Sequence, residues 1–187
     1  MSYLEHQFLV AMPDLDDPNF SRGVTLLCQH NDDGALGLTI NRPSELKLCD
    51  LFKQIGLDNH DPAVADQVVF DGGPLHQERG FVLHETTGDD RVWDSSLGVG
   101  QDLSITTSKD ILEAIAEGQG PKRFIVALGY AGWEAGQLEQ EIRENAWLNV
   151  DAKRDILFDA PIEQRWEQAV ASLGFSASAL QPSGGHA

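Results

Sequence analysis

The feature that most constrains the fold is a pair of apolar runs separated by only a few turn-forming residues. Val24–His30 and Leu36–Asn41 are rich in branched and apolar side chains, and the segment between them contains Asn31-Asp-Asp-Gly34. An Asp-Gly pair tolerates the positive φ angles that tight turns require, so the two runs predict an antiparallel β-hairpin. A shorter apolar run, Phe8–Ala11, predicts another strand before it.

Helices enter the pattern after the hairpin. Apolar residues recur at helical spacing over Lys47–Ile55, and Gly56 can adopt the left-handed conformation that ends helices. Thr107-Ser-Lys-Asp110 resembles a capping box and predicts a second helix that ends at Gly118. Leu57–Asp66 has no periodicity and is expected to be a surface loop. Further strands are predicted at Val68–Phe70, Gly80–His84 and Leu103–Thr107.

Phe124–Leu128 is apolar at every position, which predicts a central strand that is buried on both faces. We expect Gly129-Tyr-Ala-Gly132 to form a turn from this strand into a helix that carries Leu138 and Ile142. A glycine turn before a helix can present N–H groups to an anion. Glu134 would repel such an anion, so tight packing between the strand and the helix is the favoured interpretation.

The end of the chain predicts two short strands, near Trp147–Val150 and Ile156–Phe158, and a long helix from Pro161 to Gly174. Strands cluster early and alternate with helices late, which favours an α+β fold with a large mixed β-sheet and flanking helices. No repeat or linker divides the 187 residues. We therefore expect one compact domain over residues 1–187, with a short mobile tail from about residue 176.

The charge balance disfavours several classes of partner. Thirteen Lys and Arg residues against thirty Asp and Glu residues give a formal net charge of -17. This charge repels phosphate backbones and anionic lipid headgroups, and the cations form no basic stripe, so neither direct nucleic-acid binding nor membrane binding is expected. The N-terminus has no signal-peptide pattern, and no apolar stretch approaches the roughly 20 residues of a membrane helix. We therefore expect a cytoplasmic protein.

Cys28-Gln29-His30 is the most suggestive chemical pair. Residues two apart on a strand point to the same face with Cα atoms about 6.5 Å apart, so an imidazolium there would lower the pKa of the thiol. The functional interpretation is a reactive or redox-sensing thiol, or half of a metal site. The interpretation that we favour is a small buried hydrophobic Cys28 and a strand-end His30. Without a C-x-x-C or H-x-x-x-H motif, no metal and no cofactor are predicted.

Other candidate binding residues lie where the expected strands end. Asn41-Arg42-Pro43 places an amide and a cation at a rigid strand exit, where loops often carry function, although a plain strand end with a surface ion pair fits equally well. Gly72-Gly73-Pro74 can form an anion-binding backbone nest, but a simple turn is the favoured interpretation. No G-x-S-x-G motif is present, and no catalytic residue is assigned. The predicted functional surface comprises Arg22, Cys28, His30, Asn41, Arg42, Gly72, Gly73, Gly129, Tyr130, Gly132 and Trp133.

Taken together, these motifs resemble the AlgH/YqgE family of small bacterial proteins. The matching stretches include Phe8–Pro43, Val69–His84, Ile105–Leu148 and Ile156–Trp166. The resemblance implies a compact α/β domain with a large mixed sheet and flanking helices, and it implies no established catalytic activity or cofactor. Members are often labelled transcriptional regulators, after an association with control of alginate production. The cysteine position of the family matches Cys28, although Glu more usually follows it.

Three functional hypotheses follow. The favoured one is a non-catalytic binding or regulatory role through contact with a protein or a small ligand, including indirect control of transcription. The second is a thiol-based redox sensor or enzyme that uses Cys28, and it requires an accessible thiol. The third is a direct DNA-binding regulator, which the net charge makes the poorest physical fit.

Overall fold

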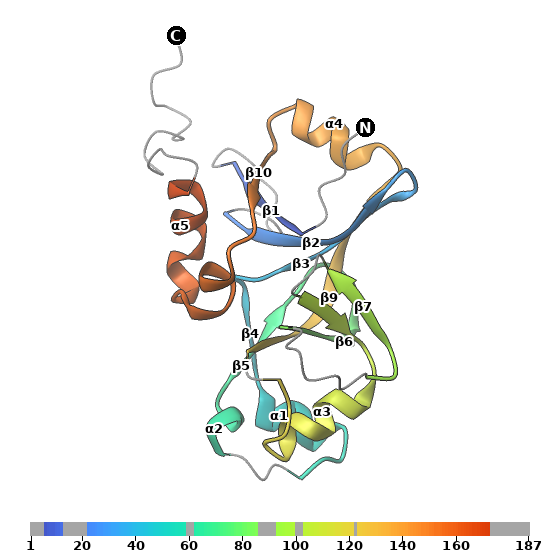
Figure 1. Cartoon of the computed structure of the whole chain (residues 1–187), viewed down its shortest axis with the longest axis vertical. Helices are drawn as coiled ribbons and strands as arrows, with labels where there is room; N and C mark the ends of the chain where they lie inside the picture. Colours follow the sequence, from blue (N-terminus) through green and yellow to red (C-terminus); the bar gives the residue numbers. More distant parts are fainter. Residues whose placement is uncertain are drawn as a thin grey trace.

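The computed structural model describes residues 6–12, 22–58, 62–85, 93–99, 103–121 and 123–172 (Figure 1). Within these residues ten strands form one curled sheet with helices at both ends. The strands are β1 (Gln7–Ala11), β2 (Val24–Asn31), β3 (Gly34–Thr39), β4 (Pro43–Lys47), β5 (Val68–Asp71), β6 (Leu75–Glu85), β7 (Ser96–Val99), β8 (Leu103–Thr106), β9 (Phe124–Glu134) and β10 (Trp147–Asp151). The helices are α1 (Leu48–Gln54), α2 (Pro62–Ala65), α3 (Lys109–Ala116), α4 (Gln137–Arg143) and α5 (Arg165–Ala171).

β9 is the central strand of the sheet. Its first half pairs antiparallel with β6 and parallel with β5, and its second half pairs antiparallel with β3. The strand order is β10-β1-β2-β3-β9-β6-β8-β7, with β4 attached through β5. The single parallel pair among antiparallel ones confirms the predicted mixed sheet.

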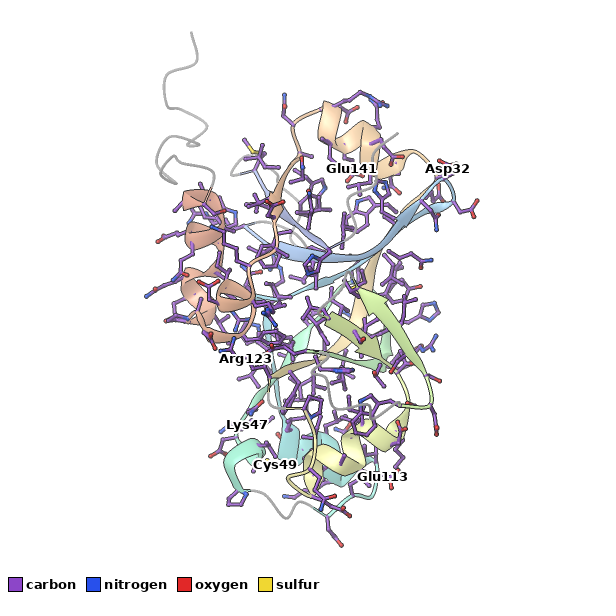
Figure 2. All side chains as sticks on the ribbon, viewed as in Figure 1. Asp32, Lys47, Cys49, Glu113, Arg123 and Glu141 are labelled. Atoms are coloured by element: carbon purple, nitrogen blue, oxygen red, sulfur yellow. The ribbon has the colours of Figure 1, made fainter. Side chains whose placement is uncertain are left out.

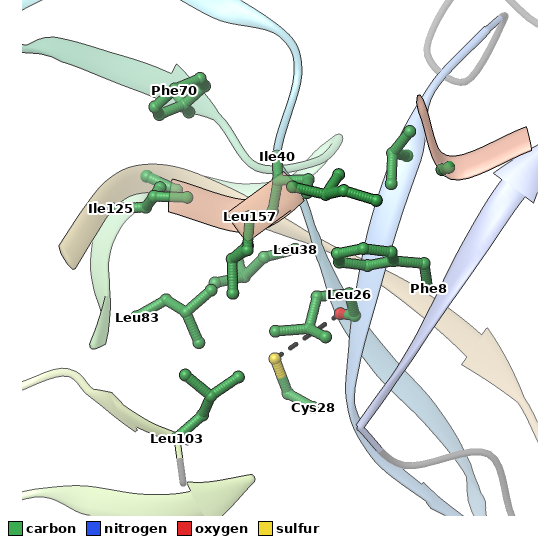
Figure 3. Packing of buried hydrophobic residues seen from close by; sticks show 14 of the residues in the cluster. Phe8, Leu26, Cys28, Leu38, Ile40, Phe70, Leu83, Leu103, Ile125 and Leu157 are labelled. Atoms are coloured by element: carbon green, nitrogen blue, oxygen red, sulfur yellow. Dashed lines mark hydrogen bonds between the residues drawn. The ribbon is translucent and has the colours of Figure 1, made fainter. Parts of the chain in front are cut away.

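Three buried clusters hold the helices to this sheet. The central cluster lies inside the curl, where Phe8, Leu38 and Leu83 belong to it (Figure 3). A second cluster joins α1 and α3 to the sheet through Phe52 and Ile111, among others. The third lies between α4 and strands β1, β2 and β9. Because each helix buries an apolar face on a different part of the sheet, the molecule is one domain with a divided core.

The caps of α1 and α3 follow the sequence signals. The Lys47 N–H donates to the Asp50 carboxylate over 3.0 Å at the start of α1, and Gly56 after its end has a φ of 76°. Ser108 is the N-cap residue of α3, and Gly118 after that helix also has a φ of 76°. Both predicted helices are therefore confirmed.

Two predicted elements are wrong. Gly129–Gly132 is not a turn, because β9 continues through it to Glu134. Gly129 is required for close packing instead, since a Cβ there would lie 2.5 Å from the carbonyl oxygen of Gly73. Ile156–Phe158 is part of a π-helix, not a strand, and Leu157 of this turn is fully buried in the central cluster. Short apolar runs do not distinguish a buried strand from a buried helical turn.

Smaller differences concern boundaries. The predicted loop Leu57–Asp66 contains the short helix α2, and β6 begins at Leu75, not at Gly80. The last helix starts with a 3-10 turn at Ile162–Gln164 before α5. The predicted tail from about residue 176 lies outside the described residues.

Candidate functional site

A β-bulge sends Cys28 and His30 to opposite faces of the sheet. The pairing of β2 with β3 shifts between Leu27 and Gln29, so Cys28 is the extra residue of the bulge. The prediction that the two side chains share a face is therefore wrong, because strand alternation holds only while the pairing is regular.

Cys28 is buried in the central cluster. Its side chain is 1% exposed, and the Sγ donates weakly to the carbonyl oxygen of Leu26 over 3.7 Å (Figure 3). Removal from water raises the pKa of the Cys28 thiol to about 12. The thiol is thus protonated and inaccessible at neutral pH, which fits a small hydrophobic core residue.

His30 lies on the other face, beneath α4. Its Nε2 is 3.3 Å from Oε1 of Glu139, and its side chain is 1% exposed. Ala35 and Trp133 share this face because the three residues are directly opposite one another across β2, β3 and β9. Trp133 also reaches α4, where its indole N–H donates to Oε1 of Glu141 over 3.0 Å. This face is therefore closed by packing.

The opposite face of β2, β3 and β9 is not covered by α4 and forms an open groove of about 900 Å³. Residues that lie directly opposite one another in antiparallel strands point to the same side of the sheet. The pairings of these strands place the following residues on the groove face: Gln29, Asn31, Gly34, Leu36, Gly132 and Glu134.

Two glycines on neighbouring strands allow close packing beside this groove. A Cβ on Gly34 would lie 2.2 Å from the carbonyl oxygen of Trp133, so the glycine lets β3 lie against β9 there. A Cβ on Gly132 would lie 2.8 Å from Cδ1 of Leu75 and 3.5 Å from Cε2 of Tyr130. The missing side chain therefore allows the Leu75 side chain to pack directly on β9, beside the Tyr130 ring.

Leu75 and Tyr130 form one end of the groove. Leu75 is 41% exposed and lies opposite Tyr130 in the pairing of β6 with β9. His76 stacks on the Tyr130 ring, with centroids 5.6 Å apart, and Phe81 meets that ring edge-on at 5.7 Å. The tyrosine ring is thus held from two sides, and Leu75 beside it presents apolar surface to water.

The groove is bordered by polar and acidic side chains. Asp33 lies at one edge, at the tip of the β2–β3 hairpin where Figure 2 labels Asp32, and Glu134 and Gln137 lie at another. The described residues that line the groove include no Lys or Arg. Its potential therefore favours cations and cationic side chains.

A second, smaller cleft of about 230 Å³ lies beside α5. Two arginines and an asparagine come to it from the segments next to β2 and β3, and two glutamates and a tryptophan come from the last helical region. The polar residues and the tryptophan are Arg22, Asn41, Arg42, Glu163, Trp166 and Glu167.

The AlgH-like family matches residues 8–178. The chain belongs to the AlgH-like family. A UPF0301 protein from Methylococcus capsulatus is 50% identical over 184 residues, which cover 98% of this chain and 96% of the relative. A UPF0301 protein from Xanthomonas campestris is also 50% identical over the same shares.

Solved structures agree with this assignment. The solution structure of the AlgH protein from Pseudomonas aeruginosa matches with a TM-score of 0.80 and 48% identity, over 100% of this chain and 97% of that one. The crystal structure of a protein from Corynebacterium diphtheriae matches with a TM-score of 0.72 and 19% identity, over 98% of this chain and 90% of that one. The second likeness concerns the fold alone.

In this AlgH-like chain the predicted surface residues divide into separate places. Tyr130 and Gly132 line the groove, and Trp133 borders it while its ring packs under α4. Three other residues of the predicted surface come together in the smaller cleft: Arg22, Asn41 and Arg42. Cys28 and His30 belong to neither place.

The glycine pair before β6 has a packing role. A Cβ on Gly72 would lie 2.5 Å from the carbonyl oxygen of Gly129, and one on Gly73 would lie 2.1 Å from the carbonyl carbon of Tyr130. The two glycines therefore let the β5–β6 connection lie directly against β9. This packing fits the turn interpretation better than an anion-binding nest.

Sequence reasoning missed two residues of these sites, Leu75 in the groove and Trp166 in the smaller cleft. Leu75 follows Pro74 between two predicted strands, and only the pairing with β9 shows its position. Trp166 lies in the predicted last helix and packs in the core, but one side of its ring carries Arg22. A leucine among polar neighbours was the one available signal.

Among the described residues no group of three or more His, Cys, Asp and Glu side chains is placed to hold a metal ion. Within the same part of the chain, no helix combines the length and apolar character needed to cross a bilayer.

Proposed function

We propose that this AlgH-like protein is a non-catalytic binding protein that holds a segment of another protein in the open groove of β2, β3 and β9. The observation that carries the proposal is the uncovered sheet face with Leu75, 41% exposed, at its end. Apolar surface removed from water is stabilising by about 25 cal/mol per Å². An exposed apolar side chain at the end of a groove is therefore suited to contact an apolar side chain of a partner.

Charge indicates the chemistry of the partner. Asp33 and Glu134 border the groove, and the whole chain carries a formal charge of -17. A segment with an apolar anchor flanked by Lys or Arg would be attracted to this surface and steered toward it. A second copy of this chain would be repelled, so the proposed partner is a different protein.

The groove chemistry supports binding over catalysis. Its described lining residues include no Ser, Thr, Cys or His, the side chains that most often act as nucleophiles and bases. Cys28, the residue on which a thiol mechanism would depend, lies in the core and not in the groove. Both features favour a surface that holds a partner without reacting with it.

The proposed role is cytoplasmic, and any effect on transcription passes through the partner protein. Direct contact with DNA is disfavoured, because the charge that attracts a basic segment repels a duplex. Under this proposal, the regulatory label of the family describes an indirect effect on transcription.

A peptide array tests the proposal. Nonapeptides with one Leu, Phe or Met flanked by Lys and Arg are compared with peptides in which Asp and Glu replace the cations. We expect the wild-type chain to bind the basic set, and Leu75→Ser to weaken binding about tenfold. Leu97→Ser on β7 is the matched control, because Leu97 is 46% exposed but lies outside the groove.

Two outcomes would contradict the proposal. One is the absence of basic-peptide binding by the wild-type chain. The other is equal weakening by the Leu75 and Leu97 variants, which would indicate general surface hydrophobicity. Circular dichroism of each variant verifies that the fold is retained.

A further inference from the structure

We infer that the cleft beside α5 binds a small zwitterion that carries a carboxylate and an ammonium group, of the chemical class of the free α-amino acids. The inference is independent of the groove, because the two places share no lining residue among those described. It depends on the way in which Asn41, Trp166 and two pairs of opposite charges are arranged.

Asn41 fixes the chain that carries Arg22. Its Oδ1 accepts from the Val24 N–H over 2.9 Å, and its Nδ2 donates to the Arg22 carbonyl oxygen over 3.0 Å. Both ends of one amide thus bind backbone groups on either side of Gly23. An asparagine two residues after β3 therefore determines where Arg22 lies, across nineteen residues of sequence.

Arg22 has a left-handed backbone, with a φ of 53°. Arginine gains nothing from this conformation, which glycine and asparagine adopt more easily, and such outliers occur where the surroundings demand a particular side chain. The strain is balanced by the Asn41 bonds and by the contact of the guanidinium with Trp166. The left-handed backbone of Arg22 therefore serves to place its guanidinium in the cleft.

Trp166 is a rigid platform for this guanidinium. Cζ of Arg22 lies 4.6 Å from the centroid of the indole ring. Trp166 is 4% exposed, and its Nε1 donates to the Ala11 carbonyl oxygen over 2.9 Å, so the indole ring has one fixed orientation. A guanidinium that stacks on an aromatic face keeps its N–H groups in the plane, where they can grip a carboxylate with two parallel bonds.

The remaining charges of the cleft select a neutral ligand with both signs. Arg42 adds a second cation, and Glu163 and Glu167 place two carboxylates in the same small space. No carboxylate of the described residues lies within 4.0 Å of the Arg22 guanidinium. A purely anionic ligand would meet both the glutamates and the field of a chain with charge -17. A zwitterion pays neither penalty, because its carboxylate can face the arginines while its ammonium faces the glutamates.

The volume limits the ligand to a small molecule. The cleft of about 230 Å³ offers space for roughly seven or eight water-sized groups, at about 30 Å³ each. A free amino acid fits this volume, whereas a nucleotide does not. The apolar side chain of Ile162 at the edge of the cleft can contact an aliphatic side chain of the ligand.

Isothermal titration of the full chain tests the inference, with each standard L-amino acid used singly at millimolar concentration. We expect at least one of them to bind, and its carboxamide and N-acetyl derivatives to bind about tenfold more weakly because each lacks one of the two charges. Arg22→Gln and Arg22→Lys should each lower the affinity about tenfold, since lysine lacks the planar fork. Arg143→Gln, an exposed change on α4, is the control and should leave the affinity unchanged.

Several results would overturn the inference. These are the absence of binding by any amino acid, an affinity that Arg22→Gln does not change, and binding of inorganic phosphate or an N-acetyl amino acid as tight as that of the free amino acid, which would indicate a plain anion site. Glu167→Gln, at an exposed position, guards against misfolding of the arginine variants. It should weaken the free amino acid but not its N-acetyl derivative.

Discussion

The rings of Trp133 and Trp147 meet edge to face, with centroids 5.9 Å apart and an interplanar angle of 80°. Both indole N–H groups point at one oxygen, Oε1 of Glu141 on α4, over 3.0 and 2.9 Å. One carboxylate, labelled in Figure 2, thus ties a helix to two strands that are not neighbours in the sheet.

Replacing Glu141 should destabilise the fold. Hydrogen bonds to a charged group contribute about 1.5–3 kcal/mol each. The two bonds share one acceptor oxygen, so their contributions are less than additive, and we expect Glu141→Ala to lower the free energy of unfolding by about 2–4 kcal/mol. Urea unfolding monitored by tryptophan fluorescence measures the change. Glu144→Ala removes an exposed carboxylate from the end of the same helix and should change the free energy by less than about 0.5 kcal/mol. Equal effects of the two variants would show that the shared acceptor is unimportant.

The thiol of Cys28 should be unreactive in the folded protein. A buried thiol whose pKa is raised to about 12 has almost no thiolate at neutral pH and no access to reagents. In a Cys49→Ser variant, which removes the half-buried thiol of α1 (Figure 2), we expect an aromatic disulfide reagent to titrate Cys28 only after denaturation. Rapid titration of the folded variant would revive the redox-sensor hypothesis.

The same thiol predicts a loss of stability at alkaline pH. In the unfolded chain Cys28 loses its proton above pH 9.0, whereas the folded chain retains it to about pH 12. The unfolded state then binds fewer protons, so the free energy of unfolding falls by about 1.4 kcal/mol per pH unit above that lower value. Cys28→Ala should unfold more easily than the wild type at neutral pH but lose stability with a shallower slope at alkaline pH. Parallel slopes for the two proteins would contradict this account.

His84 predicts a loss of stability in acid. Burial lowers the pKa of His84. Its ring belongs to a chain of hydrogen bonds: Nε2 lies 2.8 Å from Oγ1 of Thr106, and that oxygen lies 2.6 Å from Oγ of Ser96. Nδ1 faces the carbonyl oxygen of Glu85, so the neutral ring donates there and accepts from Thr106.

Below pH 6.5 the unfolded chain protonates at His84 before the folded chain does, so the free energy of unfolding decreases as the pH falls through this range. His84→Gln should flatten that dependence, measured by thermal unfolding between neutral and mildly acidic pH. His76→Gln, at an exposed ring, is the control and should keep the slope of the wild type.

Duplex DNA should not bind this protein at physiological ionic strength. A charge of -17 opposes the counterion release that drives non-specific association. Fluorescence anisotropy with a labelled duplex measures this directly. Binding that weakens steeply with added salt would show a local basic surface strong enough to overcome the net charge.

The parts of the fold that could be predicted are those encoded locally. The β2–β3 hairpin follows from Asp33-Gly34, and α1 and α3 follow from their caps and apolar spacing. The continuation of β9 through Gly129–Gly132 could not be predicted, because its glycines serve contacts with Gly73 and Leu75, which are more than fifty residues away. Glycine signals a turn locally, and only tertiary structure reveals a close approach.

The candidate sites were predictable only in part. The amide and the cation of Asn41-Arg42 at a strand exit indicate a binding position from sequence alone. In the structure these two residues line one cleft together with Arg22. The groove depends on strand register, which the sequence does not state: a single bulge residue, Cys28, decides which side chains of β2 face it. The same bulge rules out the alternative interpretation in which Cys28 and His30 act as a pair on one face, and it leaves Cys28 as the buried core residue that the sequence favoured.

β9 serves both halves of the molecule, since Phe124–Leu128 pairs with β5 and β6 while the residues after Tyr130 pair with β3. The sheet therefore cannot separate into these two parts unless β9 is broken between its first and second halves. The part of the molecule with the groove and the part with α1 and α3 should therefore unfold in one calorimetric transition on heating. Neither part, expressed as a separate fragment, should fold.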